Sequence, residues 1–282
     1  MFQAACQLAA QYTWPTTIAQ RHHDGSCSCG IGTITIVNEE GWFVTAFHIF
    51  EGFTAAVQQT LDVKKHLQDR LDIQADKSLT KKPRDKKLFA LGKVNDKAVT
   101  NVSMWLGRDG LVAENIGGVK ELDLAWGKLK GFDKSWVKTY PTFKNPAVNF
   151  DTGASLCKLG FPLYEITPTF NAATNAFQLP PSAFPLFPIE GIFTRNLDIQ
   201  NAAGASVGWM LETSSPGLRG QSGGPIFDAK GRIWALQCRT NHHNLGFNTA
   251  EPQFLHSGVG PHAKSILSAL STAGVRVQVS TD

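Results

Sequence analysis

The sequence predicts a mostly β fold, and three observations carry that prediction. The chain has 282 residues, which is enough to bury a substantial core. Valine, isoleucine, threonine and aromatic residues gather in short runs that glycine, asparagine and proline interrupt, as is typical of strands joined by turns. Two pairs of runs flank short turns and predict β-hairpins, residues 33–37 with 42–46 and residues 225–227 with 232–238.

Helices are expected in three places. Residues 1–29 predict a short helix followed by a polar lead-in. Residues 262–273 predict a closing helix, with Pro261 near its first turn and Gly274 at its end. The third helix begins an inserted segment at about residues 53–97, since four apolar residues there fit one helix face: Val57, Leu61, Leu67 and Leu71.

The inserted segment is expected to end in a basic loop. Residues 77–97 hold eight basic and two acidic residues, so this stretch carries +6 while the rest of the chain carries about −2, and the whole chain +4. Such a basic patch either binds nucleic acid or an acidic partner, or is a solvent-exposed loop that binds neither. We favour the solvated loop and expect no nucleic-acid partner, because no aromatic residues alternate with the charges.

Targeting and metal-binding signals are weak. The first ten residues have neither a basic start nor a long apolar run, and no stretch approaches the ~20 apolar residues of a membrane span. The five cysteines form no CxxC pair, so we expect no metal and no cofactor. Free thiols in a reducing cytoplasm are the simplest account, whereas a leader removed ahead of residue 1 would make this a secreted protein.

The most informative stretch is Gly220-Gln221-Ser222-Gly223-Gly224-Pro225, which places a serine in a turn of glycines. Glycine permits positive φ and close approach of the backbone. The N–H groups of Gly220 and Ser222 can then converge as an oxyanion hole, which stabilises the negative oxygen formed when a serine attacks a carbonyl.

Two upstream segments supply partners for this serine. Residues 43–47 form an apolar run that ends at His48, and Asp123 lies inside an apolar run that we expect to be a strand, where a charge needs a partner. The order His48, Asp123, Ser222 matches one of the known orders of a catalytic triad and excludes two others.

With these motifs the chain resembles the trypsin-like serine peptidases of the chymotrypsin fold, in particular the minimal bacterial Do-type and glutamyl-endopeptidase-like members. The resemblance rests on five segments that span residues 30 to 260: 30–33, 44–48, 123–125, 159–162 and 220–225. It implies two six-stranded antiparallel β-barrels and a C-terminal helix. The expected units are residues 1–29 (lead-in), 30–130 (first barrel with the insertion), 131–149 (connector), 150–258 (second barrel) and 259–282 (helix and tail).

The resemblance also implies roles for the site residues. Ser222 would be the nucleophile, His48 the general base and Asp123 the residue that orients the histidine. Digestive members carry an aspartate before the serine, which pairs with a newly freed amino terminus. This chain has Gln221 there and lacks a mature-start motif before Gly30. We therefore expect no activation by clipping; the oxyanion loop is ordered either constitutively or by a regulatory protein.

The primary substrate pocket follows from the same resemblance. Its floor would be Pro216, six residues before Ser222, and its wall the four residues Gln237, Cys238, Arg239 and Thr240. No acid lies at the floor to bind a lysine or arginine. We expect preference for an apolar or small uncharged residue, or for an acidic one if His242 or His243 lines the pocket.

The segment 177–188 is rich in proline and phenylalanine, so it cannot be a central strand. It is either a cleft wall, a partner-binding loop or a loop that covers the barrel, and we favour the last.

The leading functional hypothesis is a serine endopeptidase that cleaves an intracellular protein or peptide substrate and is activated by a partner if one is needed. The alternatives are a catalytically silent scaffold that binds a protein and an esterase without peptidase activity.

Overall fold

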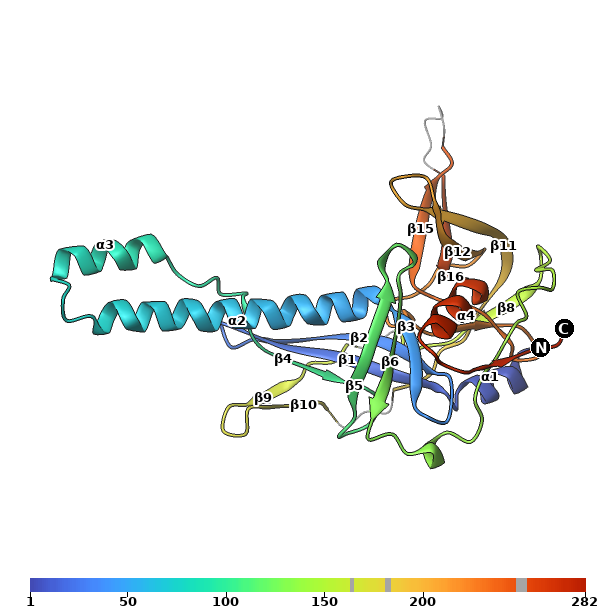
Figure 1. The fold of residues 1–282 in the computed structure, drawn as a ribbon, viewed down its shortest axis with the longest axis horizontal. Helices are drawn as coiled ribbons and strands as arrows, with labels where there is room; N and C mark the ends of the chain where they lie inside the picture. The colour runs from blue at the N-terminus through green and yellow to red at the C-terminus, as the bar shows by residue number, and fades with distance from the viewer. Residues whose placement is uncertain (163–164, 181–183, 247–252) are drawn as a thin grey trace.

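The computed structural model describes residues 1–162, 165–180, 184–246 and 253–282. Its first sheet is antiparallel and has the strand order β4-β1-β2-β3-β6-β5 (Figure 1). The six strands expected for this half are confirmed, and their bounds are β1 Thr13–His22, β2 Cys27–Ile36, β3 Trp42–Ala46, β4 Val99–Trp105, β5 Val112–Val119 and β6 Leu124–Lys130.

The sheet begins earlier in the chain than the sequence suggested. Helix α1 (Gln3–Ala9) is present as expected, but the lead-in after it is strand β1, which pairs with β2 from Thr13 to Arg21. Its threonine and isoleucine side chains favour a strand. Pro15 is tolerated because β4 pairs with β1 only from Thr17 onward, so the proline lies where one edge of β1 has no β4 partner.

The second sheet has nine strands in the order β15-β16-β12-β11-β8-β13-β14-β7-β17 rather than the expected six. The strands β7 and β17 are short and add parallel pairs at one edge, and the β15–β16 hairpin lies at the other. A separate hairpin pairs β9 (Thr169–Asn171) with β10 (Ala176–Gln178). The other bounds are β7 Thr142–Phe143, β8 Ser155–Lys158, β11 Ile189–Gln200, β12 Ser206–Thr213, β13 Pro225–Phe227, β14 Ile233–Leu236, β15 Arg239–Asn244, β16 Phe254–Pro261 and β17 Gln278–Val279.

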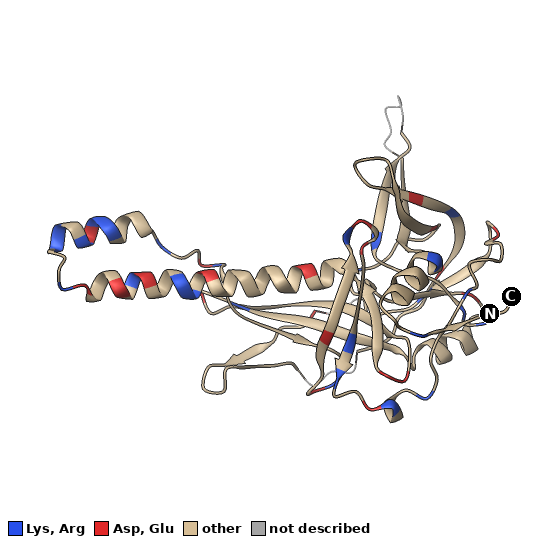
Figure 2. Cartoon of the chain, in the orientation of Figure 1, with Lys and Arg blue, Asp and Glu red and all other residues tan. Residues whose placement is uncertain are grey.

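A helical arm projects from the body of the molecule (Figure 1). Helix α2 runs from Phe47 to Ala75, and α3 (Lys81–Leu91) packs back against it before the chain returns to β4. The basic stretch is therefore largely a helix and not a loop, and its lysines stand out at the far end of the arm in Figure 2. No helix in the described part of the chain is long and apolar enough to cross a membrane.

The buried face of α2 differs from the expected one. Leu61, Leu67 and Leu71 are 53, 39 and 57% exposed. The buried residues lie near the start of the helix, where it contacts the body, and they are Ile49, Phe50, Ala56, Thr60 and Val63. The apolar spacing correctly predicted a helix but not the side that packs, because most of this helix extends beyond the body.

The main core is shared by the two sheets. Phe43 and Leu124 from the first sheet belong to the same buried cluster as Phe143, Phe227 and Ile233 from the second. A smaller cluster lies within the second sheet and comprises Leu156, Phe193, Leu211, Ile226, Trp234 and Ala235. Burial on this scale fixes the two sheets against each other, and the candidate site lies where they meet.

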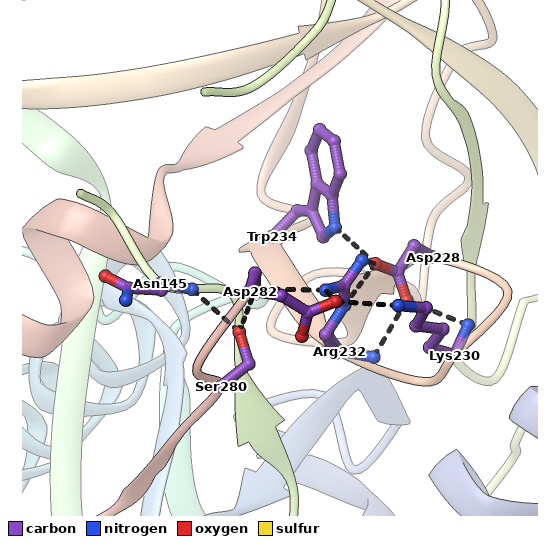
Figure 3. A network of polar contacts seen from close by, with 7 residues as sticks. All are labelled: Asn145, Asp228, Lys230, Arg232, Trp234, Ser280 and Asp282. Atoms are coloured by element: carbon purple, nitrogen blue, oxygen red, sulfur yellow. Dashed lines mark hydrogen bonds and ion pairs between the residues drawn. The ribbon is translucent and has the colours of Figure 1, made fainter. Parts of the chain in front are cut away.

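The C-terminal region closes the second sheet. Helix α4 (Ala263–Thr272) is present as expected. Beyond it, Asp282 pairs with Lys230 and Arg232 at 2.7 and 2.9 Å, and Arg232 also pairs with Asp228 (Figure 3). The indole of Trp234 donates to Asp228 at 2.9 Å, so the β13–β14 turn and the tail form one polar network.

The proline- and phenylalanine-rich segment covers the first sheet where it is described. The Phe184 ring stacks on Trp105 with centroids 5.5 Å apart and meets Phe161 edge-on. The backbone N–H of Phe187 donates to Gly160. Residues 181–183 of this segment lie outside the described residues.

Candidate active site

His48 lies in the first turn of α2, directly after strand β3. Its side chain is 47% exposed. The ring nitrogen Nδ1 lies 2.8 Å from Asp123 Oδ2, and the backbone N–H of His48 donates to Asp123 Oδ1 at 2.9 Å. Because Asp123 occupies the Nδ1 side of the ring, the opposite nitrogen, Nε2, is the one available to act as a base.

Asp123 is not inside a strand, contrary to the sequence-based expectation. It follows a single turn of 3₁₀-helix (Lys120–Leu122) and adopts the left-handed conformation with φ 51°, immediately before β6. Asp is one of the few residues other than glycine that visit this region readily. The carbonyl of Asp123 accepts the N–H of Phe47 at 3.1 Å, so both its backbone and its carboxylate hold the start of α2.

The loop that carries Ser222 is held by strand β2. The N–H of Thr33 donates to the Ser222 carbonyl at 2.8 Å, and the Thr33 hydroxyl donates to the Gly220 carbonyl at 2.7 Å. Gly220 and Gly223 have φ values of 94° and 87°. A Cβ at Gly223 would collide with the carbonyl of Thr33, so this position requires glycine both for its conformation and for space.

The two amides expected to form the oxyanion hole are free. Within the described residues, the N–H groups of Gly220 and Ser222 donate to no acceptor, whereas those of Gln221, Gly223 and Gly224 all do. Buried or half-buried amides are normally paired. Two unpaired neighbours in one turn are the arrangement that binds an oxyanion.

Cys238 contacts two of the three predicted catalytic residues. Ser222 Oγ donates to the Cys238 carbonyl at 3.1 Å, and Cys238 Sγ lies 3.3 Å from the Asp123 carbonyl oxygen. Within the described residues, no hydrogen bond joins Ser222 to His48. Hydrogen bonds between a nucleophile and its base are often long or poorly aligned in the absence of substrate, so this geometry does not argue against such a pair.

Gln221 is fully buried and bridges two segments. Its Oε1 accepts the N–H of Leu218 at 3.0 Å and its Nε2 donates to the Phe187 carbonyl at 3.2 Å. The neutral side chain of Gln221 thus links the loop that carries Ser222 to Leu218 and Phe187, and neither contact involves the amino terminus.

Two of the predicted pocket-wall residues, Gln237 and Thr240, contact the chain directly after Pro216. Thr240 Oγ1 lies 2.8 and 3.0 Å from the carbonyl and N–H of Gly217. A Cβ at Gly217 would collide with Gln237. The other two wall residues point elsewhere, since Arg239 is exposed and extends toward the sulfur of Met210 and Cys238 Sγ lies at the Asp123 carbonyl.

Neither candidate histidine joins the pocket residues within the described chain. His243 Nε2 lies 3.1 Å from Glu212, and His242 pairs with His256 across the β15–β16 hairpin. Hydrogen bonds from Arg195, Ser257 and His243 outweigh the effect of burial, which by itself would raise the Glu212 pKa, and lower it to about 2.

Sequence reasoning missed Lys158, which lies under the pocket. Its side chain is 0% exposed, and its ammonium donates to the carbonyl of Pro216 at 2.9 Å. The signal was available, since Leu156-Cys157-Lys158-Leu159 places one charge inside an apolar run. No group of three or more metal-ligating side chains occurs in the described parts of the chain.

No protein-family model and no curated protein matches the sequence. Solved structures do match. The active form of the Rv3671c protease from M. tuberculosis is 14% identical, with 97% of this chain and 86% of that chain covered and a TM-score of 0.46.

A serine-to-alanine variant of the HtrA-type protease AlgW, solved with a tripeptide, is also 14% identical, with a TM-score of 0.50. That match covers 96% of this chain and 63% of the other, so the chain spans less than two thirds of AlgW. At this identity the likeness bears on architecture alone. The chain has the fold of the trypsin-like, HtrA-type serine proteases.

Proposed function

We propose that this protein is a serine endopeptidase that uses Ser222 as nucleophile, His48 as general base and Asp123 as the orienting carboxylate. The observation that carries the proposal is the pair of free amides at Gly220 and Ser222, in a loop that also presents the serine hydroxyl. A fold alone does not define an activity, whereas a nucleophile beside unpaired donors has a specific chemical use.

The proposed reaction begins with attack of Ser222 Oγ on the scissile carbonyl carbon. His48 Nε2 takes the hydroxyl proton, and the carbonyl oxygen becomes negative and accepts the N–H groups of Gly220 and Ser222. The tetrahedral intermediate collapses, the C–N bond breaks, and His48 passes the proton to the leaving amine. Water then hydrolyses the acyl-enzyme through the same residues.

Asp123 acts on His48 in this scheme. Its carboxylate accepts from Nδ1 and so keeps the proton on that nitrogen, which leaves Nε2 as the base. It also stabilises the imidazolium formed in each step. The same carboxylate accepts the backbone N–H of His48, which fixes the position of the ring relative to the helix.

We propose a protein or peptide as the substrate, with a small uncharged residue before the cleaved bond. Support comes from Thr240 and Gln237, whose side chains lie against Gly217 directly after Pro216 and so leave little room for a large substrate side chain, and from the lack of an acid among these residues.

A serine-reactive phosphonate tests the proposal. The wild-type protein should be labelled covalently at Ser222, and Ser222→Ala should not be labelled at all. Peptide mass mapping locates the adduct. Labelling without any cleavage in a mixed peptide library would favour an esterase, and no labelling of the wild-type protein would favour a protein-binding scaffold.

A further inference from the structure

Lys158, on strand β8, is a buried lysine whose donors are all used. Its Nζ donates to Thr213 Oγ1 at 3.1 Å, to the Pro216 carbonyl at 2.9 Å and to the Ser215 carbonyl. An ammonium group has three N–H donors, and each of them has an acceptor here. All three acceptors come from residues 213–216.

The ammonium has no acidic partner. In the described parts of the chain, no carboxylate lies within ion-pair distance of Lys158, and burial lowers its pKa to about 7. An unpaired charge in the protein interior is costly. Its bonds to residues 213–216 stabilise the charged form and so offset part of this cost below about pH 7, where Lys158 is an ammonium.

These bonds hold the base of the loop that carries Ser222. In the described residues, the Pro216 carbonyl accepts from no donor other than Lys158. The chain then continues through Gly217, which is bound to Thr240, to Gly220, whose carbonyl is held by Thr33. The Ser215 carbonyl also accepts the N–H of Gly258 at 2.8 Å. Lys158 therefore shares Ser215 with Gly258 and alone holds the Pro216 carbonyl among the described residues.

We propose that Lys158 is a positioning residue that fixes the base of the loop 215–222, so that the N–H groups of Gly220 and Ser222 converge on one point. The role in catalysis rests on the proposed function; the role in ordering the loop does not. Lys158 touches neither of the two amides and acts through the backbone of Ser215 and Pro216.

Hydrogen exchange tests the ordering without any need for activity. Lys158→Met keeps a side chain of similar length and removes all three donors. Within residues 217–223, the amides that are hydrogen-bonded in the structure are those of Gly217, Leu218, Gln221 and Gly223. These four should exchange at least about tenfold faster in this variant than in the wild-type protein, because their local opening is easier. Lys144→Met is the matched control, since Lys144 is also buried, directly after β7 of the second sheet, but packs over Phe150 and Trp234. Equal protection of 217–223 in wild type and Lys158→Met would overturn the proposal.

Thr213→Val keeps the test valid if Lys158→Met does not fold. It removes one acceptor of the lysine, together with a hydroxyl that lies 3.2 Å from the Ser215 and Gly258 carbonyls, and leaves the lysine in place. Exchange at 217–223 should rise by a smaller factor. If both variants fold, the double variant should exchange more slowly than the product of the two single effects predicts, since the two residues share one bond. Fully additive effects would contradict the shared role.

Labelling kinetics test the consequence for the site. With a phosphonate that carries an alanine side chain, Lys158→Met should lower the maximal labelling rate about 10²-fold, as expected when an oxyanion donor is misplaced. Its half-saturating concentration should change little, and Lys144→Met should match the wild type. If the rate falls only with a glutamate-bearing phosphonate, Lys158 is a counter-ion for substrate and the proposal fails. A wild-type protein that no phosphonate labels would refute the proposed function while leaving the exchange result to decide the ordering role.

Discussion

Asp123 accepts hydrogen bonds from two nitrogens of His48, the ring Nδ1 at 2.8 Å and the backbone N at 2.9 Å. One carboxylate therefore sets both the tautomer of the ring and the start of the helix that carries it. The left-handed turn at Asp123 directs its carboxylate toward both nitrogens of His48. In a strand, the side chain would instead point to one face of the sheet.

Asp123→Asn should lower kcat by about 10⁴, because an amide in place of the carboxylate favours the wrong tautomer of the histidine. The backbone N–H of His48 can still bond to the amide oxygen, so the fold should persist. Steady-state hydrolysis of a peptide found by library profiling measures the loss, with circular dichroism as the control for folding. An unchanged kcat would remove Asp123 from the mechanism.

Ser222→Ala and His48→Ala should each abolish turnover, and the double variant should be no worse than either one. Residues that act as a unit are not additive, since losing one disables the other. Residual rates from the three proteins, compared with the wild type on one peptide, give the answer. A double variant much slower than both single variants would mean that the two residues act independently.

The candidate site was easier to locate in the sequence than the elements around it, for physical reasons. The glycines around Ser222 and the order of His48, Asp123 and Ser222 can be seen directly in the sequence. In the structure His48 bonds to Asp123, and Cys238 contacts both Asp123 and Ser222, while the catalytic roles of these residues stay a prediction. The left-handed turn at Asp123 was missed because an aspartate within an apolar run fits a strand equally well.

Contacts between distant segments were not predictable in the same way. Lys158 meets residues 213–216 through sheet topology, because β11 lies between β8 and β12, the strand that ends at Thr213. The sequence indicated that the arm is an insertion. The spacing of its apolar residues does not specify the direction in which the arm projects or the presence of α3, because both depend on packing between helices and body. The extra strands of the second sheet, such as β7 and β17, have only two residues each and are too short to leave a pattern.

Thr240→Gly should widen substrate choice toward larger residues before the cleaved bond. The variant removes the side chain that binds Gly217, next to the proposed pocket floor at Pro216, and we expect this to enlarge the pocket. We expect kcat/KM for a leucine substrate to rise about tenfold relative to an alanine substrate, the scale at which pocket volume discriminates. Predominant cleavage after lysine or arginine in the wild-type protein would show that the assignment of the pocket floor to Pro216 is wrong.

The 282-residue chain should react with the phosphonate without prior clipping. Gln221 already ties the loop through Leu218 and Phe187, and it has no charge with which to bind a freed amino terminus. Intact-mass spectrometry of the labelled protein should find the full chain plus the adduct. Labelling confined to an amino-terminally shortened form would contradict this.

Glu212 should make the protein sensitive to acid. Its pKa is about 2 in the folded protein and near 4.5 when exposed, so the unfolded state binds more protons between these values and stability is lost as the pH falls through them. From about pH 6 to about pH 3 the contribution lost is about 2 kcal/mol. Urea unfolding at the two pH values should show this difference for the wild type and a smaller one for Glu212→Gln.

The length of the helical arm can change without altering the contact between His48 and Asp123 at its start. The 29 residues of α2 span about 43 Å, and α3 returns the chain toward β4, beside the start of the arm. Matched insertions or deletions of whole turns in the two helices would move the basic tip closer to or farther from the body while His48 and Asp123 keep their bond. These two residues lie 75 positions apart in the chain, and much of that span is the arm, so their bond closes the chain at the point where the arm leaves the body.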